Sequence, residues 1–100
     1  MKFKDTTVVW KNFKPELWVA IVTAAEIYAT HGFELVITSG NDGTHMEGSL
    51  HYKNSACDIR TRDLLASLIP VIIQQLKAEI GKDYDVVLEK DHIHIEYQPK

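Results

Sequence analysis

Two apolar periods alternate along this chain, one typical of helices and one typical of strands. Pro15 suits the first turn of a helix, and Gly32 is a common type of residue at a helix end. Between them the apolar residues recur at helical spacing, at Leu17, Ile21, Ala24, Ala25 and Tyr28. The pattern predicts a helix over residues 15–31.

A second apolar repeat runs from Leu64 to Ile80, with an apolar residue at every fourth position, and ends before Gly81. It predicts another helix with a broad apolar face. Pro70 lies inside the repeat. Because proline lacks an amide donor and clashes with the preceding turn, it should kink this helix or divide it.

Shorter runs rich in strand-favouring residues make up much of the rest of the chain. They predict strands over residues 34–38, 56–60, 84–88 and 92–97. Only residues 89–91 separate the last two strands, so we expect a hairpin there. Residues 6–10 also contain β-branched types and predict a short edge strand.

Residues 40–54 show no periodicity and contain several turn-forming residues. A loop of this length in a small domain is either disordered or functional. The whole order of elements predicts an α+β fold, with a mainly antiparallel sheet covered on one face by two or three helices. We expect residues 1–100 to form one domain.

Charge and composition argue against several classes of protein. The formal net charge of −3 leaves no basic surplus for binding a nucleic-acid backbone. No uncharged apolar run is long enough to predict a membrane span. The single cysteine, Cys57, cannot form an intramolecular disulfide. The charged N-terminal residues do not form a signal peptide, so we expect a protein that is cytoplasmic as synthesised. The oligomeric state is left open.

The chain has five histidines, and two of them lie in the last predicted strand. Because side chains of a strand alternate between faces, His92, His94 and Glu96 should share one face, while Ile93 and Ile95 point to the core. Two histidines at this spacing are a candidate metal pair. Taken alone, they would more commonly be polar residues on a solvated strand face.

His51 and Asp58 strengthen the metal hypothesis. A catalytic zinc ion usually takes three protein ligands through nitrogen or oxygen and keeps a fourth position for water. His51, Asp58 and one of His92 or His94 would supply such a set. Taken individually, Asp58 could equally be an exposed carboxylate on a strand, and His51 a solvated histidine in a loop.

These residues lie in two motifs that resemble a known family. Residues 49–58 resemble the Ser-x-His-x-x-Gly-x-Ala-x-Asp motif of zinc D-Ala-D-Ala carboxypeptidases and L-alanyl-D-glutamate peptidases. Residues 91–94 resemble that family's second motif, an acid followed by His-x-His. The stretches 45–52 and 92–94 are also similar to the signalling domain of hedgehog proteins, which shares this zinc site. The resemblance implies a hedgehog/DD-peptidase-like fold.

The resemblance also implies roles for individual residues. His51, Asp58 and His94 would be the zinc ligands, and His92 would lie beside the metal. The family's general base precedes the last ligand by three residues, which is Asp91 here. Glu89, which is similar to a hedgehog-domain glutamate, is the alternative base.

Several positions depart from the motifs or match them only in part. Asn54 replaces the family glycine, and asparagine tolerates a left-handed backbone better than most residues. The family arginine that follows Ser39-Gly40 is missing, so its role is empty or falls to Lys53, Arg60 or Arg62.

Two lesser expectations follow from the hedgehog resemblance. His45 matches a histidine near the zinc. The acidic residues that bind calcium in hedgehog domains are present only in part, at Asp42 and Glu47.

The function implied by the resemblance is zinc-dependent hydrolysis of peptidoglycan stem or cross-link peptides, as in a phage or prophage lysin that is released to the cell wall. Asp91 or Glu89 would take a proton from the attacking water. The alternative is a hedgehog-like zinc-binding module that acts in partner binding, with little or no catalysis. The missing arginine favours this alternative.

Overall fold

The computed structural model describes residues 1–40 and 54–99, which contain two α-helices, one 3₁₀ turn and five strands. In chain order these elements are β1 (Lys2–Phe3), α1 (Pro15–Thr30), β2 (Val36–Ser39), β3 (Ala56–Arg60), the 3₁₀ turn Ala66–Leu68, α2 (Ile69–Ile80), β4 (Tyr84–Leu88) and β5 (His92–Tyr97).

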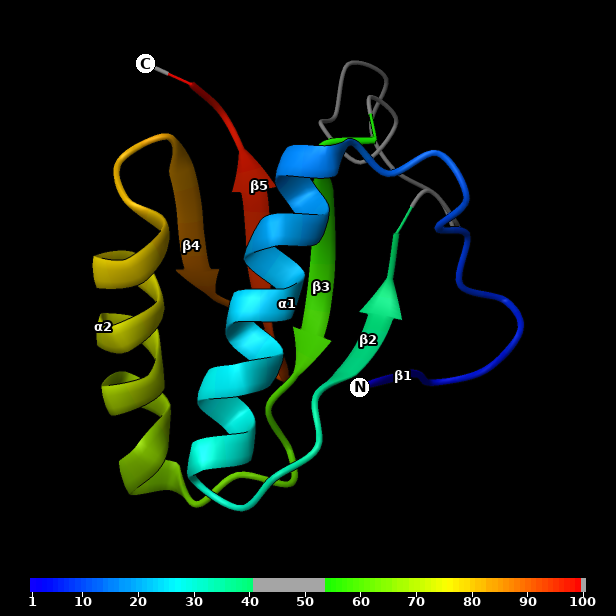
Figure 1. Ribbon diagram of the computed structural model, residues 1–100. Coiled ribbons are helices and arrows are strands. Elements are labelled where there is room, and N and C mark those ends of the chain that lie inside the picture. Colours follow the sequence, from blue (N-terminus) through cyan, green and yellow to red (C-terminus); the bar gives the residue numbers. More distant parts are fainter. Residues whose placement is uncertain (41–53, 100) are drawn as a thin grey trace.

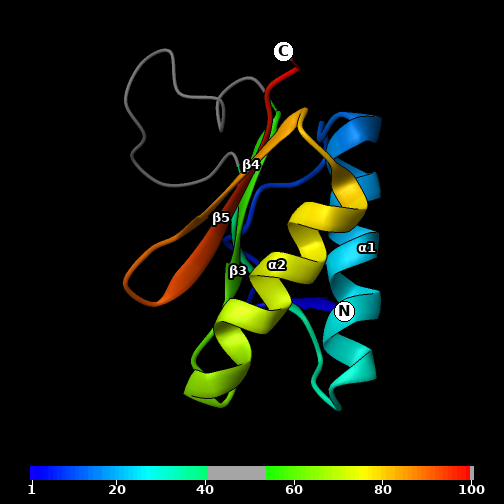
Figure 2. The same ribbon diagram turned by 90° about the vertical axis from the view of Figure 1, so that its left-hand side faces the viewer.

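The five strands form one sheet in the order β1-β2-β3-β5-β4. The pair β1 and β2 is parallel, and the other three pairs are antiparallel. Both helices lie on the same face of the sheet, as the edge-on view shows (Figures 1 and 2). The predicted α+β class, with a mainly antiparallel sheet and helices on one face, is confirmed.

Helix α1 begins and ends close to the predicted positions. Lys14 has an extended backbone before Pro15, whose fixed φ suits the first turn. The helix stops at Thr30, and Gly32 follows with a φ of 85°, a conformation that costs glycine little. Near its C-terminal end, the buried Tyr28 donates a hydrogen bond of 2.8 Å to the backbone oxygen of Arg60. This bond ties the helix to the end of β3.

Pro70 divides the second apolar repeat. The residues before it form the 3₁₀ turn Ala66–Leu68, and Pro70 lies in the first turn of α2. A proline in this position removes an amide that has no helical partner in any case, so the helix starts there without losing a hydrogen bond. Gly81 ends α2, as predicted.

The core lies between the sheet and the two helices. Fully burying a valine, leucine or isoleucine side chain stabilises a fold by roughly 1.5–3 kcal/mol. The buried side chains shared by the helices and the central strands include Leu17, Ile21, Ala24, Ile37, Ile59, Ile72, Leu76, Ile93 and Ile95.

The prediction of an edge strand over residues 6–10 is wrong. Only Lys2–Phe3 pairs with β2 at this edge. Residues 6–10 instead turn away from the ladder, and Val8 becomes buried together with Phe13. Of the β-branched residues in this segment, Val8 packs in the core, while Thr6, Thr7 and Val9 are exposed.

Gly40, which follows β2, packs closely against the irregular segment that contains Val9 and Phe13. A Cβ atom on Gly40 would meet the backbone oxygen of Val9 and would lie 2.6 Å from the ring of Phe13. The backbone oxygen cannot turn aside as the end of a side chain can. We expect Gly40→Ala to lower the free energy of unfolding by about 1–3 kcal/mol in urea denaturation, because the added methyl group overpacks the contact.

Gly32→Asn is the matched control. A Cβ at position 32 meets nothing within 4 Å, and asparagine tolerates the positive φ. This variant should change the free energy of unfolding by less than about 1 kcal/mol. Equal losses in the two variants would contradict the importance of the close contact at Gly40.

Candidate metal centre

The register of β3 and β5 brings the predicted site residues together. Asp58 is the direct cross-strand partner of His94, and Arg60 is the partner of His92. Ile59 and Ile93, which pair between them, are fully buried toward the helices. Because alternate residues of a strand face opposite ways, Asp58, Arg60, His92 and His94 lie on the other face. We call this the open face.

His94 is held between two carboxylates. Its Nδ1 lies 2.9 Å from Oδ1 of Asp58, and its Nε2 lies 2.6 Å from Oε1 of Glu96. The three side chains are partly buried, with exposed fractions of 14% for Asp58, 18% for His94 and 21% for Glu96. Such a setting favours strong charge-assisted hydrogen bonds.

The carboxylates change the protonation of His94. The hydrogen bond with Asp58 is the largest of the effects that raise the pKa of His94, and Glu96 contributes in the same direction. Partial burial opposes them by disfavouring the charged ring. The net effect raises the pKa, so in the absence of a metal both carboxylates stabilise a protonated His94.

His92 connects this cluster to Asp91. Nε2 of His92 lies 3.6 Å from Oδ2 of Asp58, and Nδ1 lies 2.7 Å from Oδ1 of Asp91. The hydrogen bond with His92 is the largest of the effects that lower the pKa of the exposed Asp91. Although an ideal strand would point Asp91 away from His94, its position at the turn lets it contact His92.

Glu89 has a different position in the hairpin. Its backbone amide donates a hydrogen bond of 2.9 Å to the backbone oxygen of His92, which helps to close the turn between β4 and β5. The predicted hairpin is confirmed, and the Glu89 side chain is exposed. Of the two candidate bases, Asp91 is the one that contacts a histidine of the cluster.

The other predicted residues of the loop lie outside the described residues. These are the ligand His51, together with Asp42, His45, Glu47 and Lys53. Asn54 is described, and its φ of 63° confirms that asparagine adopts the left-handed conformation expected at the family's glycine position. Its backbone oxygen accepts a hydrogen bond of 2.9 Å from the amide of Lys14, so the start of β3 is anchored to the start of α1.

The donor atoms present suit a zinc ion in part. Asp58 offers carboxylate oxygens and His94 a ring nitrogen, which are ligand types that zinc accepts. Within residues 1–40 and 54–99, no group of three or more His, Cys, Asp or Glu side chains is arranged to hold a metal ion. The pair therefore supplies two of the three predicted ligands, and the third, His51, belongs to the loop outside the described residues.

Cys57 is not a candidate ligand on this face. It pairs with Ile95 in the register and is fully buried on the helix side of the sheet. Burial raises the pKa of its thiol, so the thiolate that binds metals is disfavoured. The side chains that the described strands offer to a metal on the open face therefore carry nitrogen and oxygen donors.

Glu96 is a member of the cluster that the sequence analysis did not single out as a site residue. Its spacing of two positions from His94 in a strand was the available signal, because it places both residues on one face. A carboxylate that binds the second nitrogen of a metal-ligating histidine fixes the tautomer and orientation of the ring. Glu96 occupies this position relative to His94.

Comparisons with known proteins give a partial match. The chain is 40% identical over 65 residues to the Tiggy-winkle hedgehog protein of Danio rerio, and 40% identical over 65 residues to the Sonic hedgehog protein of Xenopus laevis. Each match covers 63% of this chain, but only 15% and 14% of the respective hedgehog protein. No protein-family model matches the chain. The chain is thus similar to a small part of hedgehog proteins.

Neither described helix has the length and apolar character required to cross a membrane.

Proposed function

We propose that this chain is a hedgehog-like zinc-binding module whose open face binds a partner. His51, Asp58 and His94 would hold the ion. The observation that carries the proposal is the cross-strand pairing of Asp58 with His94, whose oxygen and nitrogen atoms lie 2.9 Å apart on the open face. The similarity to hedgehog proteins favours this function over catalysis.

A zinc peptidase acting on peptidoglycan peptides is the second candidate. The chain of contacts from Asp91 through His92 to Asp58 supports it, because it joins an exposed carboxylate to the predicted ligand cluster. Bound zinc would supply a more acidic water and polarise the peptide carbonyl. Asp91 would accept the proton of that water, and His92 would orient the carboxylate and donate a hydrogen bond to the developing oxyanion.

Zinc content is the first test. We expect about one zinc ion per chain by elemental analysis of protein purified without added metal, because a structural or catalytic site binds zinc tightly. Less than about a tenth of an ion per chain, with none regained on adding zinc, would refute the metal centre.

Substitutions in β5 test which histidine binds the metal. His94→Ala should lower zinc occupancy much more than His92→Ala, because the resemblance places only His94 on the metal. His94 also lies closer to the predicted ligand Asp58, at 2.9 Å against 3.6 Å for His92. His31→Ala is the control, since His31 contacts Gln75 on the other side of the molecule. Equal losses in the His92 and His94 variants would mean that the pair is assigned wrongly.

Glu96 should affect zinc affinity without being a ligand. Because Glu96 orients the ring of His94, we expect Glu96→Ala to weaken zinc binding by about 10–100-fold in a chelator competition titration. Glu96→Gln keeps an acceptor oxygen and should lose less. Glu79→Ala, an exposed substitution on α2, should leave the affinity unchanged. Wild-type affinity in Glu96→Ala would remove Glu96 from the centre.

A digest of purified peptidoglycan separates the two candidate functions. If the chain is a peptidase, Asp91→Ala should keep its zinc and fold but lose about a hundred- to ten-thousandfold in hydrolysis, as expected for a general base. Glu89→Ala should be milder. An inactive Glu89→Ala beside an active Asp91→Ala would assign the base to Glu89. A zinc-loaded wild type that cleaves nothing would leave the binding module as the function.

A further inference from the structure

A polar hollow of about 250 Å³ lies beside the histidine cluster, between Lys4 after β1, Thr38 within β2, the end of β3 and the start of β5. Its lining comes from residues far apart in the sequence, namely Lys4, Thr38, Arg60, Arg62, Asp91 and His92. His92 belongs both to this lining and to the contacts around Asp58. The hollow and the candidate metal centre are therefore neighbours on the open face.

The charge of the lining is opposite to that of the whole chain. Lys4, Arg60 and Arg62 contribute three positive charges and Asp91 one negative charge, so the lining has a net charge of +2 with neutral histidine. The chain as a whole has a formal charge of −3. A concave surface lined by one sign of charge concentrates its field and attracts counter-charged ligands.

Backbone hydrogen bonds and burial position two of the three cations of the hollow, Lys4 and Arg60. The backbone amide of Lys4 donates a hydrogen bond of 2.9 Å to Ile37, next to Thr38. The backbone oxygen of Arg60 accepts the hydrogen bond of Tyr28, and the Arg60 side chain is only 19% exposed. Its guanidinium lies 4.0 Å from Asp63, at the limit of an ion pair. The Arg60 side chain and the backbone of Lys4 are thus positioned before any ligand arrives.

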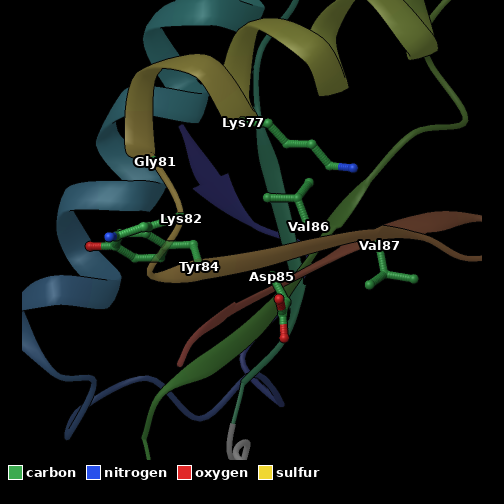
Figure 3. Close-up of a pocket in the computed structure, with 7 residues that line it drawn as sticks. All are labelled: Lys77, Gly81, Lys82, Tyr84, Asp85, Val86 and Val87. Atoms are coloured by element: carbon green, nitrogen blue, oxygen red, sulfur yellow. The ribbon is translucent and has the colours of Figure 1, made fainter. Parts of the chain in front are cut away.

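A second hollow provides a comparison. It is larger, at about 360 Å³, and lies between the end of α2 and the edge strand β4. Its charged residues are Lys77, Lys82 and Asp85, which give the lining a net charge of +1. Figure 3 shows Lys77 extended over Val86, while Asp85 points to the other side of the strand. Its cations are fewer and its lining includes valines, so it suits an oxyanion less well.

We propose that the hollow lined by Lys4, Arg60 and Arg62 binds an oxyanionic group of a ligand, either a carboxylate or a sulfate or phosphate group. Arginine forms bidentate hydrogen bonds with all of these groups. Thr38 also lines the hollow, and its hydroxyl donates a hydrogen bond of 3.3 Å to the backbone oxygen of Asp58. The proposal goes beyond zinc binding, because these cations act on the anion directly.

The test is a titration followed by two-dimensional ¹H–¹⁵N NMR at constant ionic strength, with sodium sulfate and sodium acetate as separate probes. We expect saturable shifts of the Thr38, Arg60 and Arg62 signals with at least one probe. Tighter binding of sulfate would indicate a sulfate or phosphate ligand, and tighter binding of acetate a carboxylate ligand. Shifts that do not saturate with either probe would overturn the proposal.

Variants connect the shifts to the hollow. Arg62→Gln should weaken binding about fivefold, the effect of losing one exposed ion pair. Lys4→Gln is the second variant, should Arg62→Gln fail to fold. Lys77→Gln, in the comparison hollow, should leave binding unchanged. Equal effects of Lys77→Gln and the variants in the hollow, or no effect of the latter, would overturn the proposal.

A repeat after treatment with EDTA separates this proposal from the zinc proposal. Binding that is the same with and without EDTA supports an anion site formed by the cations. Binding that disappears with EDTA, while the NMR spectrum shows that the fold persists, would mean that the anion coordinates a metal ion. That result would overturn the proposed anion site. A chain that contains no zinc at all can still pass this test.

Discussion

The pairing register of β3 with β5 is the constraint on which both the core and the site depend. Ile59 faces Ile93 on the buried side, and one position along, Asp58 faces His94 on the open side. A shift of one residue in a strand would move every side chain to the opposite face. The burial of the isoleucines therefore fixes where the aspartate and the histidine meet, and the site inherits its geometry from the core.

Local patterns predicted the parts of the fold that have local causes. Alternation predicted β5, and Pro15 marked the start of α1. The strand expected over residues 6–10 failed because strand formation needs a partner, and β2 pairs with Lys2–Phe3 instead. The contact of Asp58 with His94 depends on register, and the hollow around Arg60 joins four separate parts of the chain. The motif resemblance grouped Asp58 with His94 as ligands, but the spacing along the sequence encodes neither the register of their contact nor the hollow.

The open face combines two kinds of chemistry side by side. Asp58 and His94 offer oxygen and nitrogen donors for a metal, while Arg60 and its neighbours form a positively charged hollow. His92 touches both. A partner with an acidic group could thus contact the hollow and the proposed metal at once. Such contacts would be possible without any catalytic step.

X-ray absorption spectroscopy at the zinc edge tests most directly whether a metal binds on the open face. We expect only nitrogen and oxygen neighbours of the zinc ion, at about 2.0–2.2 Å, with the multiple scattering of two imidazole rings from His51 and His94. A sulfur neighbour at about 2.3 Å would contradict this expectation, because Cys57 is buried on the helix side of the sheet. A protein that retains no zinc for the measurement would contradict it equally.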